Sequence, residues 1–147
     1  MFKSRTISIP IYRPYDEVYE FLVEPRNFPS WASNLGPDFT RITDYEWATT
    51  TRNGRVILRF SPRNEHGILD HSVFLEGKTP TVTPMRLIEN DEGCEIIYTQ
   101  FQRPGMTEAA FASEVEWVTS DFAALRSLLE STTSNEVVFH DDEGEQG

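Results

Sequence analysis

The side chains best suited to acid–base chemistry are consecutive: Asp70, His71 and Ser72. A carboxylate or an imidazole can move a proton to or from a bound molecule, and a hydroxyl can exchange hydrogen bonds with it. Consecutive residues of a strand point to opposite faces, so His71 and Ser72 cannot form a base–nucleophile pair. The candidate catalytic residues are therefore Asp70 or His71, whichever one faces a pocket.

Signatures of other chemistries are missing. The three histidines (His66, His71 and His140) and the single cysteine, Cys94, show no zinc-site spacing. G-x-S-x-G, P-loop and G-x-G-x-x-G motifs are absent, and no carboxylate pair suggests a glycosidase. We therefore expect no metal and no cofactor. Cys94 is predicted to be a small core residue, with no disulfide partner in the chain.

The element that must position these residues is a long helix near the C-terminus. Its apolar residues recur at alternating spacings of four and three: Phe111, Val115, Val118, Phe122, Leu125 and Leu129. This spacing places them on one stripe of a helix over 108–130, about 35 Å long. Thr107 can cap its first turn. Such a helix needs a broad apolar surface to pack on.

Strand-like segments can supply that surface. Residues 5–12 alternate as a strand, Pro14 opens a short helix, and a second short turn follows at Pro25. From residue 39 the period becomes two, which predicts strands near 39–42, 44–51, 55–61, 66–76, 80–89 and 94–102. The order predicts an antiparallel α+β domain. After residue 130 the chain becomes acidic, so we expect one domain over 1–130 and a disordered tail over 131–147.

This order resembles the helix-grip domains of the START-like superfamily (SRPBCC), which includes polyketide cyclases, Bet v 1 allergens and lipid-transfer domains. The opening SIPIYRPYDEVYEFLVEPRNFPSWASNLG looks like the start of such domains. The stretches EHGILDHSV and PMRLIENDEGCEIIYTQFQRPGM look like the polyketide cyclase/dehydrase-like bacterial branch. Arg13 departs from the pattern, because a good capping residue usually precedes the helix proline. The resemblance implies a curved, seven-stranded antiparallel sheet around the long helix, with two short helices after the first strand and an apolar cavity between sheet and long helix.

Turn positions predict which residues face that cavity. The Asn53-Gly54 turn predicts Trp47 opposite Phe60, and the next loop predicts Leu58 near Asp70. The interior face then collects mainly apolar residues: Tyr45, Trp47, Val56, Leu58, Phe60, Ile68, Phe74, Met85, Leu87, Ile96 and Tyr98. Asp70 is the only charged residue on it. A slip by one residue would bring His71 inside instead.

Eight residues are candidate ligand contacts: Trp31, Tyr45, Trp47, Leu58, Asp70, Met85, Arg86 and Tyr98. Asp70 is either a polar anchor in the pocket or a carboxylate satisfied by its neighbours. Arg86 either pairs with Glu95 on the outer face or holds a ligand carboxylate. Trp31 either gates the pocket or caps the core.

Composition limits the possible partners. The net charge of −11 argues against nucleic acid and against anionic membrane surfaces. No segment has the length of a membrane span or the pattern of a signal peptide, so we expect a soluble, cytoplasmic protein without membrane insertion. The sequence leaves the oligomeric state open.

We expect binding of a hydrophobic small molecule: polyketide-like, lipid-like or an aromatic metabolite. The alternatives are a cyclase or aromatase, with Asp70 or His71 as acid–base group and Tyr98 or Arg86 polarising a carbonyl, and a co-chaperone-like interaction module.

Overall fold

The computed structural model describes residues 1–131. In chain order its elements are β1 (Ser4–Ile11), α1 (Tyr15–Val23), the 3-10 helix η1 (Pro25–Ser30), β2 (Thr40–Arg41), β3 (Glu46–Thr51), β4 (Gly54–Phe60), β5 (His71–Leu75), β6 (Thr81–Thr83), β7 (Met85–Asn90), β8 (Gly93–Phe101) and α2 (Glu108–Ser131). The predicted tail lies, except for its first residue, outside the described residues. Within residues 1–131 no helix is long and apolar enough to cross a membrane.

The strands form two antiparallel ladders, β1-β8-β7 and β2-β3-β4-β5-β6. All seven predicted strands are present, but the sixth is divided at Pro84 into β6 and β7. Proline has no N–H to donate to a ladder, so it marks the break. Two backbone bonds tie the loop before β5 to β7, from Leu69 N–H to the Met85 carbonyl and from Leu87 N–H to the Gly67 carbonyl, both 2.9 Å.

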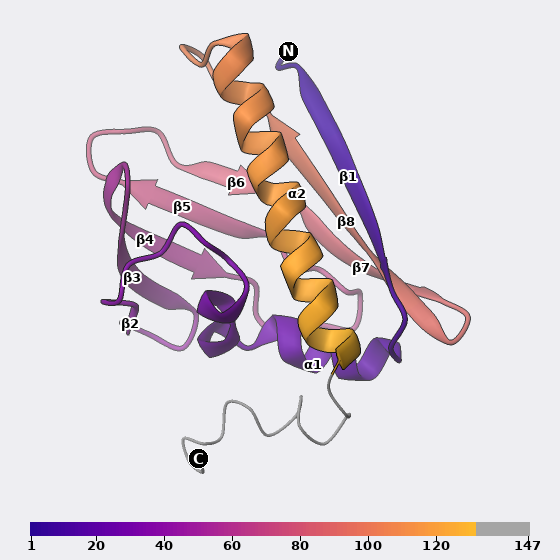
Figure 1. The fold of residues 1–147 in the computed structure, drawn as a ribbon. Helices are drawn as coiled ribbons and strands as arrows, with labels where there is room; N and C mark the ends of the chain where they lie inside the picture. The colour runs from indigo at the N-terminus through magenta and orange to yellow at the C-terminus, as the bar shows by residue number, and fades with distance from the viewer. Residues whose placement is uncertain (132–147) are drawn as a thin grey trace.

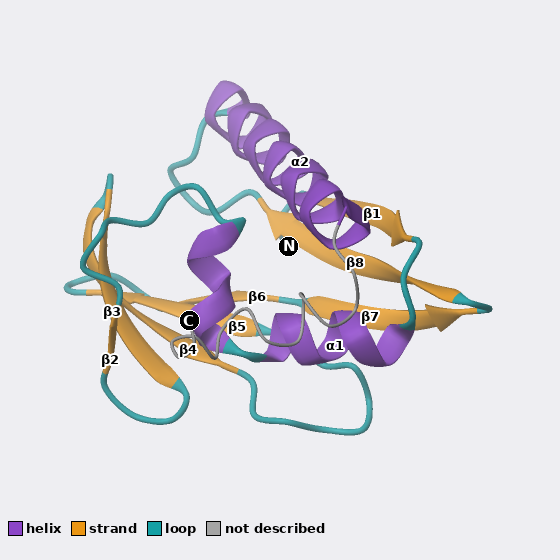
Figure 2. Cartoon of the chain, turned by 60° about the horizontal axis from the view of Figure 1, so that its bottom comes forward, coloured by secondary structure: helices purple, strands orange, loops and turns teal. Residues whose placement is uncertain are grey.

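The long helix is the predicted one. The Thr107 hydroxyl accepts a hydrogen bond from the Ala110 N–H at 3.0 Å, which satisfies one of the free donors of the first turn. The predicted stripe is buried apart from Val118, which is half-buried. Figures 1 and 2 show α2 lying over the concave side of the strands, which curve from β2 at one edge to β1 at the other.

The hydrophobic core fills only one end of this arrangement. It is made by α1, β7, β8 and the C-terminal half of α2, and it contains Ile11, Val18, Tyr19, Phe21, Leu69, Met85, Leu87, Cys94, Ile96, Tyr98, Phe122, Leu125 and Leu129. Figure 1 places α1 beside the C-terminal end of α2. Cys94 is buried here as predicted, and desolvation raises the pKa of its thiol to about 11. Most of the N-terminal half of α2 lies beyond this core, although the half-buried Val118 packs against it.

In two strand pairs, β7–β8 and β3–β4, the residues predicted to face the interior do so. Met85 lies opposite Tyr98, as predicted. Trp47 lies opposite Leu58 rather than Phe60, a shift of two positions that leaves the same side chains inside.

The register between β4 and β5 is different from the prediction. Leu58 lies opposite Val73, where the turns predicted Asp70. A shift by three positions is odd, so it exchanges the two faces of β5. His71 and Val73 therefore point inward with Leu58, while Phe74, predicted inside, lies on the outer face opposite Ile57.

The physical reason is the connection between β4 and β5, which is a long loop rather than a tight turn. The Asn64 side-chain oxygen accepts hydrogen bonds from the backbone N–H groups of His66 and Ile68, at 2.9 and 3.0 Å. Ser61 donates to the Asp70 carbonyl at 2.6 Å. Ile68 and Asp70 are thus part of this loop, and β5 begins only at His71.

Candidate functional site

A cavity of about 890 Å³ lies between the concave face of the strands and the N-terminal half of α2. β4 to β6 line one side, α2 lines the opposite side, and the loops around 34, 52, 78 and 104 surround the opening. Much of its wall is apolar: Phe28, Val56, Leu58, Val73, Leu75, Met106 and Val118. A cavity of this size and lining is typical of a small-molecule site.

His71 is a titratable group in this wall. Its ring packs edge-on against Phe28, with centroids 5.6 Å apart, and lies 6.3 Å from the Phe60 ring. Desolvation lowers the pKa of His71, outweighing the opposite effects of the Leu69 backbone and the Asp70 charge. The imidazole is therefore neutral at neutral pH and can accept or donate a hydrogen bond.

A second polar row crosses from β8 to α2. The Tyr98 hydroxyl donates to the Gln100 side-chain oxygen at 3.3 Å, and the Gln100 amide donates to Glu114 at 2.9 Å. Burial raises the pKa of Tyr98 to about 12, partly offset by its hydrogen bond to Thr83. Tyr98 is therefore a neutral phenol within reach of a molecule in the cavity.

The opening is bordered by contacts between loops and α2. The Arg52 guanidinium, in the β3–β4 turn, stacks 3.3 Å from the centroid of the Trp117 ring. The Trp117 indole N–H donates to the Ser33 hydroxyl at 2.6 Å, and the Ser33 backbone N–H donates to Asp121 at 3.2 Å. These contacts hold two loops against the helix at the cavity edge.

Three of the candidate catalytic and ligand-contact residues line the cavity: Leu58, His71 and Tyr98. Asp70, predicted inside, does not. Its carboxylate accepts a hydrogen bond from the Met85 N–H at 2.8 Å and lies 3.8 Å from the Arg86 guanidinium. The predicted Arg86–Glu95 pair is replaced by this Asp70–Arg86 pair. The odd register shift explains both corrections, because it removes Asp70 from the inner face.

The other candidates lie outside the cavity wall. Met85 is a core residue. Trp31 stacks on Phe122 with ring centroids 5.5 Å apart, which places it at the core end. Trp47 is buried on a stacked contact with Phe39 at 4.7 Å.

Tyr45, predicted to face the interior, is 46% exposed. Trp47 and Tyr45 border a smaller hollow of about 310 Å³ next to η1, and Arg26, Arg41 and Arg63 border it as well.

Sequence reasoning missed several cavity residues. Gln100 lies two positions beyond Tyr98, so alternation along β8 puts it on the same face. Glu114 lies three positions after the stripe residue Phe111, and Asp121 lies one position before the stripe residue Phe122. Both are therefore at the edge of the buried face of α2. Thr81 and Thr83 also alternate inward. Within residues 1–131, no group of His, Cys, Asp and Glu side chains could hold a metal ion.

No family model and no curated protein matches this sequence. Solved structures do match its fold. A START superfamily protein from Mycobacterium smegmatis superposes with a TM-score of 0.67 at 10% identity, over 88% of this chain and 99% of that one. Ara h 8.0201 superposes with a TM-score of 0.66 at 12% identity, over 90% of this chain and 100% of that one. A conserved protein from Geobacillus kaustophilus superposes with a TM-score of 0.68 at 12% identity, over 88% of this chain and 96% of that one.

Proposed function

The chain has the helix-grip fold of the START-like superfamily, and we propose that it binds a hydrophobic small molecule in the cavity under α2. The observation that carries the proposal is the cavity itself, about 890 Å³ within a chain of 147 residues. An interaction module predicts a filled core instead. Polyketide-like, lipid-like or aromatic molecules fit the apolar wall.

Such a molecule would be held between the strands on one side and α2 on the other. Val56, Leu58 and Val73 offer apolar contact from the strands, and Val118 does so from α2. Burial of this surface supplies about 25 cal/mol for each Å² of apolar area removed from water. The neutral groups of His71 and Tyr98 supply hydrogen bonds that orient the molecule.

The first experiment is native mass spectrometry of freshly purified protein, followed by organic extraction of what it carries. A bound apolar molecule supports the proposal, and its structure identifies the ligand class. An added protein mass without a small molecule supports the interaction module.

A matched pair of variants locates the site. Val73 points into the cavity from β5, whereas Val82, on the neighbouring strand β6, is 49% exposed and does not line it. Val73→Trp should fill the cavity and weaken binding of the extracted molecule at least about tenfold, because the added rings occupy ligand volume. Val82→Trp should leave the affinity unchanged. Isothermal titration of both variants checks this, and equal affinities would contradict the cavity as the site.

A cyclase-type reaction is the second candidate, and one observation favours it. His71 is a neutral imidazole facing the cavity, in reach of the same bound molecule as the Tyr98 phenol. A base and a hydrogen-bond donor on one ligand are the minimum for proton transfer next to a carbonyl. A mass change of the extracted molecule on incubation with protein would favour this candidate.

A further inference from the structure

Most lysine and arginine side chains of this acidic protein are paired with a carboxylate, and most of the unpaired ones lie at the cavity. All 13 lysines and arginines lie within residues 1–131, and nine of them form ion pairs with a carboxylate there. Four have no carboxylate within ion-pair distance in this part of the chain: Arg5, Arg52, Lys78 and Arg103. Three of these four, all except Arg5, line the cavity.

Each of the three cavity cations keeps donors available. Arg103 donates one N–H to the Val82 carbonyl at 3.1 Å and lies 5.5 Å from the Phe101 ring centroid. A guanidinium has five N–H donors, so others remain. The exposed Lys78 side chain makes no hydrogen bond with residues 1–131. The Arg52 guanidinium stacks on Trp117, and the Arg52 backbone N–H donates to the Asn34 side-chain oxygen at 3.2 Å.

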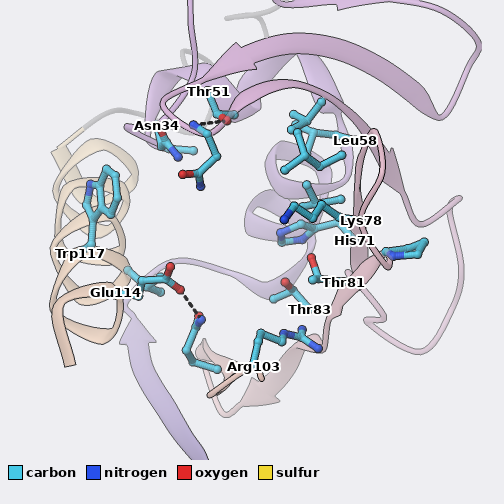
Figure 3. A pocket seen from close by; sticks show the side chains of 18 of the residues that line it. Asn34, Thr51, Leu58, His71, Lys78, Thr81, Thr83, Arg103, Glu114 and Trp117 are labelled. Atoms are coloured by element: carbon cyan, nitrogen blue, oxygen red, sulfur yellow. Dashed lines mark hydrogen bonds between the residues drawn. The ribbon is translucent and has the colours of Figure 1, made fainter. Parts of the chain in front are cut away.

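Two of these cations share one wall. Lys78 precedes β6 by three residues, and Arg103 is bonded to the middle of β6. Along the chain, Lys78 and Val82 are at most about 13 Å apart. Figure 3 shows Lys78, Thr81, Thr83 and Arg103 together on one side of the cavity, with Glu114 and Trp117 on the opposite side. An anion beside β6 would therefore lie between two cations, near the Thr81 hydroxyl.

The acids of the cavity are already engaged on the opposite side. Glu114 accepts the Gln100 amide, and Asp121 accepts the Ser33 N–H. With His71 neutral, the charged lining residues are three cations and two carboxylates, a positive balance in a chain of net charge −11. A cavity of opposite sign to its protein attracts an anion.

We propose that the ligand is an amphipathic anion: an apolar body under α2 and a single acidic head group, of carboxylate type, against Lys78, Thr81 and Arg103. This inference rests on the proposed function and specifies its ligand class. Arg103 supplies a planar fork for the head group, and Lys78 supplies a point charge at the rim. The salt dependence of binding follows, because both cations are in contact with solvent.

The test compares two fluorescent probes of the same ring skeleton, the anionic anilinonaphthalene sulfonate and the neutral phenylnaphthylamine. The native protein should bind both and prefer the anionic probe. Lys78→Gln and Arg103→Gln should each weaken the anionic probe about fivefold, and the double variant more than about tenfold, with neutral-probe affinity unchanged. Arg5→Gln, the unpaired cation outside the cavity, is the matched control, and melting temperatures confirm folding.

Each other outcome counts against a defined part of the argument. Equal affinities for both probes, unchanged in the double variant, would refute the anionic head group and leave the binding cavity intact. A double variant that weakens both probes alike, or an Arg5→Gln variant that weakens the anionic probe as much, would also refute a local anion site. Failure of the native protein to bind either probe would refute the proposed function together with this inference.

Discussion

His71 places an imidazole against two phenylalanine rings in the cavity wall, where a charge is poorly solvated. This burial lowers the pKa of His71 below the value of about 6.5 of an unfolded chain. As pH falls, the unfolded chain therefore takes up the proton first. Below about pH 6.5 the free energy of unfolding should decrease until the pH reaches the folded-state pKa of His71.

The His71→Gln variant tests this linkage. Its free energy of unfolding should decline less between about pH 6.5 and pH 5 than that of the native protein, measured by urea denaturation at each pH. His66→Gln is the control, because His66 is an exposed histidine outside the cavity wall. A slope in His71→Gln equal to that of the native protein would mean that the His71 imidazole is well solvated in the folded protein.

Single residues also show the limit of sequence reasoning. The sequence predicted that Asp70 or His71 would face the pocket, with His71 inward only if the register slipped by one. The actual shift is set by the Asn64 loop, whose hydrogen bonds are visible only in three dimensions. Because side chains alternate, a loop of unknown length decides the face of every residue after it.

The positions of helices and strands were more predictable than the face of the sheet to which each side chain points. The spacing of the apolar stripe predicted α2 to within one residue at its C-terminus, because a long run without Gly or Pro offers one packing solution. The Pro84 break was not predicted, although proline inside a strand is a warning. β6 consequently pairs with β5 rather than continuing the ladder of β7, and Thr81 and Thr83 line the cavity.

The loop before β5 allows a sharp prediction at this scale. Gly67 has φ of +70°, and a Cβ there would lie 2.2 Å from the Leu87 carbonyl oxygen. Gly77 has a similar φ of +78° but open space around it. Gly77→Ala should cost about 1 kcal/mol from backbone strain alone, and Gly67→Ala at least about 2 kcal/mol more.

Chemical denaturation of the two variants isolates the steric contribution, since the backbone strain is common to both. Gly67→Ala must push β7 away from the loop, at the backbone bond from the Leu87 N–H to the Gly67 carbonyl. Equal losses of stability would show that this loop moves freely away from β7.

The whole molecule is divided into a solid end and a hollow end along α2. Val115 is 6% exposed and does not line the cavity, whereas Val118, less than one turn later, lines it. Val115→Ala should lower the free energy of unfolding by about 2 kcal/mol, because it leaves a void among packed atoms. Val118→Ala should cost about half as much, since its methyl groups border open volume.

Thermal and urea unfolding of this valine pair measures the division directly. Similar losses would indicate that the cavity wall is as tightly packed as the core. At this scale the sequence predicted the fold and the cavity through its resemblance to helix-grip domains. It could not predict the charge of the cavity, because ion pairing depends on which distant residues meet.

Cys94 has a practical consequence for following this protein in solution. It is the sole cysteine of the chain, and its thiol is buried with a pKa of about 11, so thiol-reactive dyes should leave it unmodified in the folded state. A cysteine introduced at an exposed position, such as Asn53 in the β3–β4 turn, would then be the single reactive site. A dye attached there reports the distance between that turn and any second label, without first removing a native thiol.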